Sequence, residues 1–546
     1  MFYLRNKLHL IIIFLASILF TLPFYRSGFF STHDGEWSII RLAEMVREVK
    51  DLQFPPRWAD FLNHGYGYPL FSFTYPLPYY AGVLLKFMKF SLVDSIKILF
   101  LLSVFLSTYF MYKLGSILHN KTSGLYSALY YLSANYRLVN LYIRGSLGES
   151  LALIFFPLIF YLGIIYLNHP SIWNYVFFSI SLAGLVLSHN VMAIIFFPFF
   201  MIFYFLYHIQ LKRKFILTGW KIMILPLLQG FGLAAYFYIP ALLEKKYIYL
   251  SQAPLSSISE NFIKLKDLVY IPWNYGIQPP ISLGIGHSLA LFFVLITYLL
   301  SKNKNYKKDI LIIFLSVSLL SLFYLTNINS IFFWKIPPLV WLDFPWRLMG
   351  VIIFFISLMM MYLPKKSLLN TIFMLLTFIV LLYNLNFAKP EAYINKTDSY
   401  YQTNDATTTS KDELMPIWVQ NKAKERYISK IESNDRTLEI TDLSYNSKNI
   451  DFNATVQNAT KININSLFFP GWRFQIDGKN APISIQEPDG VMSLELNQGN
   501  HQIRGIFEET PLRLIADWIS ILSLFFLIII VKFNKYFFHI HENKKI

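Results

Sequence analysis

The sequence predicts a polytopic α-helical membrane protein with a C-terminal β-sandwich domain outside the membrane. Of its 546 residues, 55% are hydrophobic and only 15% are charged, and the mean hydropathy is +0.44. A soluble domain of this size could not bury so much apolar surface, because the buried fraction rises only slowly with chain length. Several apolar runs are also long enough to cross a bilayer, since about 20 helical residues span roughly 30 Å of hydrocarbon.

We expect about twelve membrane spans, because this arrangement keeps the lysine and arginine clusters on one side, as the positive-inside rule requires. The predicted spans cover residues 8–25, 94–113, 122–138, 149–168, 171–188, 190–208, 216–242, 284–300, 309–327, 346–363, 367–386 and 514–531. Both termini are then cytoplasmic, and the protein is expected in the plasma membrane. The N-terminal run resembles a signal peptide, but no small-residue cleavage site follows it, so it is interpreted as a retained first span.

The apolar run 71–90 decides this arrangement, because a crossing there would move every later basic cluster to the outside. Pro76 and Pro78 interrupt the run, and Lys86 and Lys89 lie near its end. We therefore expect it to lie on the outer face of the membrane or to be re-entrant. The alternative is a protein of thirteen spans with a weak charge bias.

Three regions follow from this topology. Residues 1–386 form the transmembrane domain, with a long first outer loop at 26–93. Residues 387–513 form the outer β-rich domain, and residues 514–546 supply the last span and a basic cytoplasmic tail. Alternating apolar and polar residues predict strands in the β-rich domain, at 437–440, 450–456, 461–466 and 501–507. Asp477-Gly478 suits a tight hairpin turn within it.

Charge and cysteine content exclude several classes of protein. The net charge of +16 is spread over short clusters between apolar runs, which argues against a nucleic-acid partner. The chain contains no cysteine, and this excludes disulfides, thiolate metal sites and a cysteine nucleophile.

The motif His33-Asp34-Gly35-Glu36 follows the first span and opens an amphipathic stretch that is expected to form a helix on the membrane surface. One of its two carboxylates could act as a general base, with the other as its support. The pair could instead share a divalent cation such as Mg²⁺ or Mn²⁺, the one cofactor that we consider. An equally good interpretation is structural: Asp34 caps the helix and Glu36 interacts with its dipole.

Arg57 and His64 lie later in the first loop, among glycines and tyrosines. Such a mixture suits a sugar or a lipid headgroup, and both residues are candidates for substrate binding. An interfacial belt of aromatic residues is the simpler explanation and is favoured when the segment is taken alone.

Three further polar groups are placed at predicted span ends on the same outer side. Arg144 and Glu149 flank a glycine-containing turn, His189 and Asn190 lie between two spans, and Asp343 and Arg347 precede another. These sites are candidates for phosphate and sugar binding. Each also has a structural interpretation, as an ion pair that caps a helix, a polar turn or an interfacial anchor. All of these residues are placed on the same outer side, and this shared position favours a functional site.

In sum, these motifs resemble the GT-C superfamily of membrane glycosyltransferases. The likeness is carried by His33-Asp34-Gly35-Glu36, Arg144-Gly145 with Glu149, Ser188-His189-Asn190, Phe344-Pro345-Trp346-Arg347, and Asp412-Glu413-Leu414 with Pro416. More narrowly, they resemble uncharacterised bacterial membrane proteins labelled "6-pyruvoyl-tetrahydropterin synthase related". The segment from Pro470-Gly471-Trp472 to Asp477-Gly478-Lys479 is similar to the outer domain of YfhO-like membrane proteins.

The resemblance implies a sugar donor linked to polyprenyl phosphate and an acceptor in the cell envelope, which is a glycan, lipid or protein. Asp34 is then expected to be the general base of an inverting transfer, with Glu36 as support. Arg144 and Arg347 are expected to neutralise the departing phosphate, and His189 and Asn190 to orient the substrate. Two alternatives stay open, a transporter or flippase for a lipid-linked glycan and a non-catalytic membrane scaffold.

Overall fold

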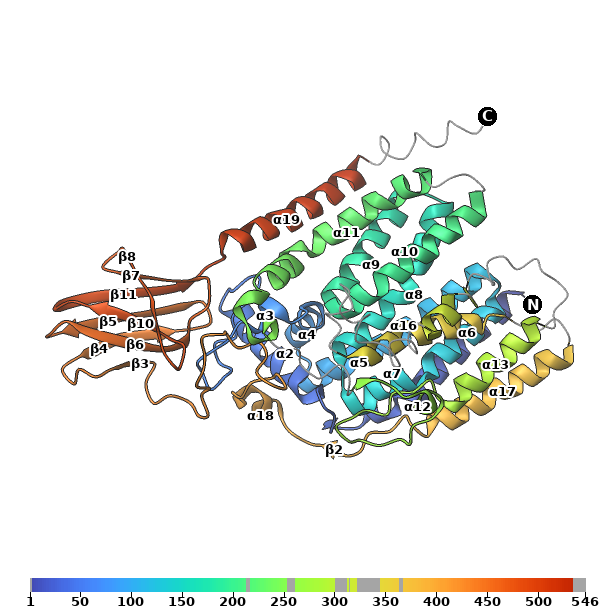
Figure 1. Ribbon diagram of the computed structural model, residues 1–546, viewed down its shortest axis with the longest axis horizontal. Helices are drawn as coiled ribbons and strands as arrows, with labels where there is room; N and C mark the ends of the chain where they lie inside the picture. Colours follow the sequence, from blue (N-terminus) through green and yellow to red (C-terminus); the bar gives the residue numbers. More distant parts are fainter. Residues whose placement is uncertain are drawn as a thin grey trace.

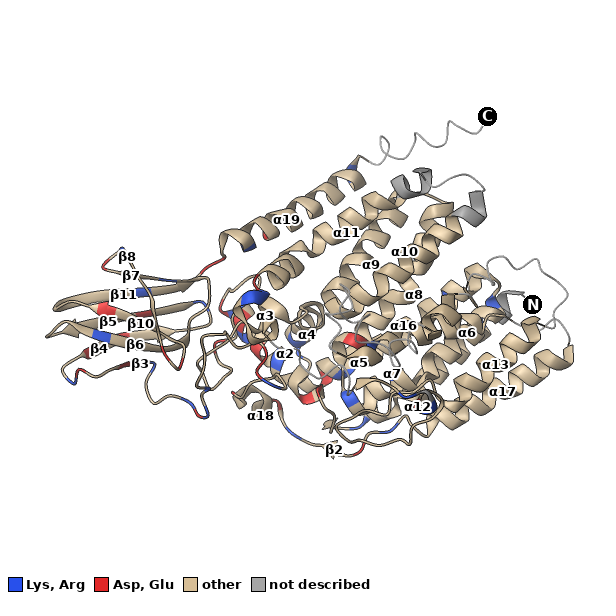
Figure 2. Ribbon diagram, viewed as in Figure 1, with Lys and Arg blue, Asp and Glu red and all other residues tan. Residues whose placement is uncertain are grey.

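The computed structural model describes residues 2–212, 217–252, 261–299, 312–313, 315–321, 344–362 and 367–533. A bundle of helices forms most of the molecule, and the β domain projects from one end of it (Figure 1). Charged residues are scarce along the long helices and gather where the bundle meets the β domain (Figure 2). This distribution suits a bundle embedded in a membrane, since charged side chains are costly in hydrocarbon.

Seven helices in the described part of the chain are long and apolar enough to cross a membrane. They are α1 (Phe2–Thr21), α5 (Leu92–Leu118), α8 (Leu147–Asn168), α10 (Asn190–Lys212), α11 (Leu217–Leu243), α17 (Ser367–Leu385) and α19 (Pro511–Lys532). Three further predicted spans form shorter apolar helices, which are α9 (Ile172–Ser188), α13 (Ile285–Leu299) and α16 (Met349–Met359) with the turn before it. Most of the predicted span 309–327 lies outside the described residues, and a total of twelve stays a prediction.

The predicted span 122–138 is wrong as a single helix. Helix α6 (Lys121–Ser133) ends where Ala134 adopts an extended backbone, and a short helix α7 (Asn135–Val139) and a π-turn (Asn140–Arg144) follow. Buried polar side chains stabilise this break, because Asn135 donates to Ser282 Oγ at 2.6 Å and Arg137 donates to Ser107 Oγ at 2.6 Å. The break brings the end of the π-turn to the site described below.

The apolar run 71–90 forms two short helices rather than one long one, and its expected place on the outer face of the membrane or in a re-entrant position stays a prediction. The two helices are α3 (Leu70–Phe73) and α4 (Leu77–Phe87), and the break between them contains Pro76. At about 1.5 Å per residue, α4 covers only about 17 Å, which is too short to cross the hydrocarbon core.

Helix α2 (Gly35–Lys50) is enclosed by protein on both faces, so the expectation of a helix lying on a membrane surface is wrong. Ile39 and Leu42 are fully buried on its apolar face, which packs towards α4 and α5. Glu44 and Glu48 are equally buried on its polar face. The rest of the first loop covers that face, where the Phe61 backbone N–H donates to Glu44 Oε1 at 3.2 Å.

The β domain is a sandwich of two antiparallel sheets, with strand orders β3-β6-β10-β9 and β4-β5-β11-β7-β8. Its strands are β3 (Ile431–Ser433), β4 (Glu439–Tyr445), β5 (Asn449–Val456), β6 (Thr460–Leu467), β7 (Trp472–Ile476), β8 (Lys479–Ala481), β9 (Ser484–Gln486), β10 (Val491–Leu496) and β11 (Gly499–Phe507). The predicted strands 450–456, 461–466 and 501–507 correspond to β5, β6 and β11, whereas the predicted strand 437–440 covers only the first two residues of β4. The turn joining β7 to β8 is Asp477-Gly478. Both turn residues have positive φ, 53° and 76°, as a type I′ turn requires.

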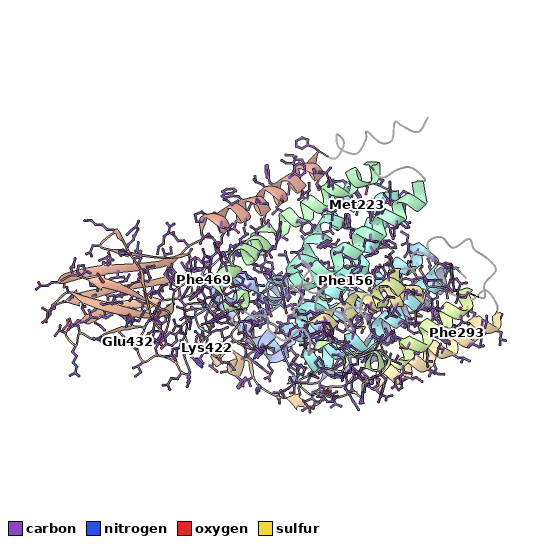
Figure 3. All side chains as sticks on the ribbon, viewed as in Figure 1. Phe156, Met223, Phe293, Lys422, Glu432 and Phe469 are labelled. Carbon is purple, nitrogen blue, oxygen red and sulfur yellow. The ribbon has the colours of Figure 1, made fainter. Side chains whose placement is uncertain are left out.

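The chain between the helices and the sandwich returns to the first loop. The short strand β2 (Tyr393–Ile394) pairs with β1 (Phe29–Phe30), and helix α18 (Asp398–Thr403) packs near α2. The sandwich itself begins only at β3. Its base is buried against the first loop, where Trp58 contacts Phe469, a residue at the junction of sandwich and bundle (Figure 3).

Candidate active site

A cavity of about 1140 Å³ lies where the first loop, several helix ends and the segment before the sandwich meet. Its wall includes many of the residues that the sequence singles out, which are His33, Asp34, Arg144, His189, Asn190 and Arg347. Residues from the segments 261–281 and 409–414 complete it. The volume is at the upper end of the range for ligand pockets, roughly 300–1,000 Å³.

Backbone pairing fixes Asp34 beside Arg144. The backbone N–H of Asp34 donates to the Arg144 carbonyl oxygen at 2.8 Å, and that of His33 donates to the Ile143 carbonyl oxygen at 2.9 Å. The carboxylate of Asp34 makes no capping hydrogen bond, and the Gly35 N–H donates to Thr32 Oγ1. Within the described residues, the Asp34 carboxylate has no hydrogen bond or ion pair. The interpretation of Asp34 as a helix cap is therefore wrong.

Gly145 makes this pairing possible. Its φ is +62°, and a Cβ atom at this position would lie 2.3 Å from Thr32 Oγ1 and 2.7 Å from the Gly35 nitrogen. Only a residue without a side chain lets the π-turn approach the acidic motif so closely.

We expect Gly145→Ala to lower the thermal midpoint and to reduce activity, because the clash separates Asp34 from Arg144. Gly478→Ala is the matched control, since Gly478 has φ +76° but nothing within 4 Å of the added Cβ. It carries only the cost of a left-handed backbone, about 1–2 kcal/mol. Equal losses of thermal midpoint in the two purified variants would contradict the proposed clash.

Glu149 organises the cationic side of the cavity from a fully buried position near the start of α8. Arg144 binds it through two hydrogen bonds, of 2.7 and 2.9 Å, and Arg347 Nε donates to it at 3.2 Å. The hydroxyl of Tyr136 donates at 2.6 Å, and the amide of Asn140 at 3.3 Å. One carboxylate thus orients two guanidinium groups.

The Arg144–Glu149–Arg347 cluster brings two guanidinium groups to one buried carboxylate. The Arg144 guanidinium also lies over the Trp346 ring, 4.3 Å from its centroid, and the Arg347 guanidinium lies 5.0 Å from the Phe344 centroid. Both arginines line the cavity. A guanidinium pair held in a fixed orientation is suited to binding a phosphate.

His189 adds a neutral hydrogen-bond donor at the turn between α9 and α10. Its Nδ1 accepts the backbone N–H of Met192 at 3.3 Å, which leaves the ring proton on Nε2. The ring stacks on Tyr75 with centroids 4.9 Å apart. Burial lowers the pKa of His189 to about 3, against the opposing effect of Glu149, so the imidazole is uncharged at neutral pH.

The other acidic residue of the motif points elsewhere. Glu36 accepts from Lys396 Nζ at 3.1 Å and from the Tyr401 hydroxyl at 3.2 Å, and it does not line the cavity. Asp34 and Glu36 therefore do not fit a shared divalent cation. Across the part of the chain that the structure describes, no cluster of three or more His, Asp or Glu side chains is arranged to hold a metal ion.

Arg57 and His64 lie away from the cavity and join parts of the fold. Arg57 is buried and binds Glu509 at 3.0 Å, Asp517 at 3.1 Å and the Tyr236 carbonyl oxygen at 2.9 Å. It therefore connects the first loop with α11 and α19. His64 Nδ1 lies 3.3 Å from Asp405 Oδ1. Neither residue lines the cavity, and Asp343 lies outside the described residues.

Several residues of the cavity wall are not among the site residues predicted from the sequence. On α2, Trp37, Ser38 and Arg41 line it together with Asp34, at the i, i+3, i+4 and i+7 spacing of one helix face. This spacing in the sequence indicates that the four residues share one face of the helix. Tyr75 also lines the cavity, whereas Tyr68 and Tyr79 are fully buried. Tyr68 and Tyr79 therefore lie inside the protein rather than in an interfacial belt.

No family model matches the chain. An uncharacterised protein of Lactococcus lactis subsp. cremoris (strain MG1363) is 30% identical over 240 residues, which make up 42% of this chain and 39% of that protein. The chain thus matches well under half of its relative's length.

Two solved structures show a distant likeness. Arabinofuranosyltransferase AftD from Mycobacteria has a TM-score of 0.47 and 13% identity, covering 72% of this chain and 28% of that one. The oligosaccharyltransferase of Archaeoglobus fulgidus has a TM-score of 0.47 and 11% identity, covering 76% and 61%. Because both scores are below 0.5, the function proposed next rests on the cavity itself.

Proposed function

We propose that this protein is a glycosyltransferase that moves a sugar from a polyprenyl-phosphate carrier to an acceptor in the cell envelope. The observation that carries the proposal is the content of the cavity. It holds a carboxylate that has no partner among the described residues, Asp34, beside the guanidinium pair of Arg144 and Arg347. Transfer from a lipid phosphate needs a base for the acceptor and a cationic site for the leaving group.

In this mechanism an acceptor hydroxyl attacks the anomeric carbon of the donor. Its proton passes to Asp34, the new glycosidic C–O bond forms, and the bond between the anomeric carbon and the phosphate oxygen breaks. The electron pair leaves with the polyprenyl phosphate, whose charge Arg144 and Arg347 neutralise. Direct displacement inverts the anomeric centre. His189 donates from Nε2 to orient the phosphate or the sugar, and Asn190 lines the same wall.

The position of the charged groups favours this reaction over transport. Arg144 precedes α8, His189 precedes α10 and Arg347 precedes α16, so all three lie at helix ends. A transporter is expected to carry its ionisable residues near the middle of the bilayer, in broken helices. The proposed orientation places the cavity and the β domain outside, with both termini in the cytoplasm.

Deletion of the gene in its own host tests this function. We expect the envelope glycan to lose a sugar, as measured by mass spectrometry, and the polyprenyl-phosphate sugar to accumulate on the outer leaflet. Re-expression of the full chain should restore both. An unchanged envelope would contradict the proposal, and accumulation on the cytoplasmic leaflet alone would indicate a flippase instead.

A further inference from the structure

Arg41 is a cavity-lining cation that the proposed reaction does not use. It lies on α2, seven residues after Asp34, and therefore on the same face of the helix. Trp37 and Ser38 lie between them on that face and line the same cavity.

No carboxylate of the described chain forms an ion pair with Arg41. Its Nε donates to Thr408 Oγ1 at 3.1 Å, and its Nη2 donates to the Thr408 carbonyl oxygen. By contrast, Arg57, Arg144 and Arg513 each pair with a carboxylate in the interior. Arg137 is buried and has no ion pair among the described residues, but it does not line the cavity. Arg41 is half-buried at the cavity wall, where an anionic ligand could form the charge-assisted hydrogen bonds that no carboxylate of the described residues supplies.

The segment that Arg41 holds contributes a second cation. The hydroxyls of Thr408 and Tyr68 are 2.9 Å apart, which fixes Thr408 from its other side. The residues that follow, Thr409 to Lys411 and Glu413 to Leu414, line the cavity. The Leu250 N–H donates to the Glu413 carbonyl oxygen at 2.8 Å and anchors the segment. The segment that contains Asp412-Glu413-Leu414 thus holds Lys411 at the cavity wall.

The order of groups along α2 separates this cation from the phosphate site. Asp34 is bound through its backbone to Arg144 at the start of the helix, and Arg41 lies two turns further on. The axial rise between the two α-carbons is about 10 Å. An anion at Arg41 therefore lies on the side of the base away from Arg144, within one or two sugar units of the reacting hydroxyl. In the proposed reaction, the acceptor occupies this side of Asp34.

We propose that Arg41, together with Lys411, binds an anionic group of the acceptor, a carboxylate or a phosphate ester. The acceptor is then an acidic glycan or a phosphate-containing polymer rather than a neutral sugar chain. This inference rests on the proposed function, which assigns the Arg144–Arg347 pair to the phosphate of the donor. Trp37 supplies an apolar face next to Arg41 for a sugar ring.

Binding of small probes to the full-length protein in nanodiscs tests the inference. The anionic probes are methyl β-D-glucuronide and glycerol 1-phosphate, the neutral probes are methyl β-D-glucoside and glycerol, and undecaprenyl phosphate reports on the donor site. We expect at least one anionic probe to raise the thermal midpoint more than its neutral counterpart. Arg41→Gln should weaken that binding about tenfold, since a charge-assisted hydrogen bond is lost, and leave undecaprenyl phosphate binding unchanged.

Arg47→Gln is the matched control, because Arg47 lies on the same helix but outside the cavity and pairs with Glu44. It should bind all probes like the wild type. Lys411→Gln removes an exposed side chain, so it tests the site without endangering the fold, and it should weaken the anionic probe as well.

Three results would overturn the inference. They are an equal response to anionic and neutral probes, an unchanged affinity in Arg41→Gln and Lys411→Gln, or a loss of undecaprenyl phosphate binding in Arg41→Gln. The last result would assign Arg41 to a second phosphate of the donor. Failure of the wild type to bind undecaprenyl phosphate at all would count against the proposed function instead, so the two failures are distinguishable.

Discussion

Glu149→Gln is expected to destabilise the protein and abolish its activity together. The substitution leaves the Arg144 and Arg347 guanidinium groups without their shared counter-ion in a buried position. Breaking a buried ion pair by removing one partner costs about 3–5 kcal/mol. The thermal midpoint of the purified full-length protein should fall markedly, and transfer should be lost because neither arginine keeps its orientation.

Two companion variants separate this effect from a general loss of charge. Glu36→Gln removes a carboxylate from a partly exposed pair with Lys396, and such pairs contribute about 0–1 kcal/mol. Its midpoint should therefore change little. Adding Arg347→Gln to Glu149→Gln should recover part of the lost stability, since only one guanidinium group is then left without the Glu149 carboxylate. Additive losses in the double variant would contradict a shared counter-ion.

Asp34→Asn is expected to lower transfer by a factor of about 10²–10⁴ while leaving the fold intact, because it removes the proposed general base. The amide has nearly the shape of the carboxylate, and the Asp34 side chain forms no hydrogen bond with the described residues. The thermal midpoint and the binding of undecaprenyl phosphate should both stay at their wild-type values. Transfer is measured as incorporation of labelled sugar into envelope material.

Glu36→Gln also tests how the two carboxylates of the motif divide their roles. Retained transfer in this variant would assign the base to Asp34 alone, as the contact of Glu36 with Lys396 suggests. A loss as large as that of Asp34→Asn would show that both carboxylates act in the reaction.

The sequence was most informative about residues whose position alone made them unusual. Arg144, His189 and Arg347 stood out because polar residues at the ends of apolar helices are costly unless they have a role. The strands and the Asp477-Gly478 turn were predictable because alternation and positive φ leave local signals. These features depend on neighbours in the sequence.

The errors concern contacts between distant segments. Arg57 resembled a ligand-binding residue, but its carboxylate partners come from residues 509 and 517, far along the chain. Helix α2 had the pattern of a surface helix, yet the rest of its own loop covers its polar face. Glu149 was predicted as one ligand among several. Its role as the common partner of Arg144 and Arg347 follows only from the fold.

The central proposal is that Asp34 and the Arg144–Arg347 pair act on one donor in one cavity. Its most direct test is the amount of free polyprenyl phosphate released by the purified protein, supplied with lipid-linked sugars and envelope acceptor extracted from its own host. We predict one polyprenyl phosphate released per sugar transferred by the wild type, and almost none by Asp34→Asn although it still binds the lipid. Release and transfer at the wild-type rate by Asp34→Asn would contradict the proposal.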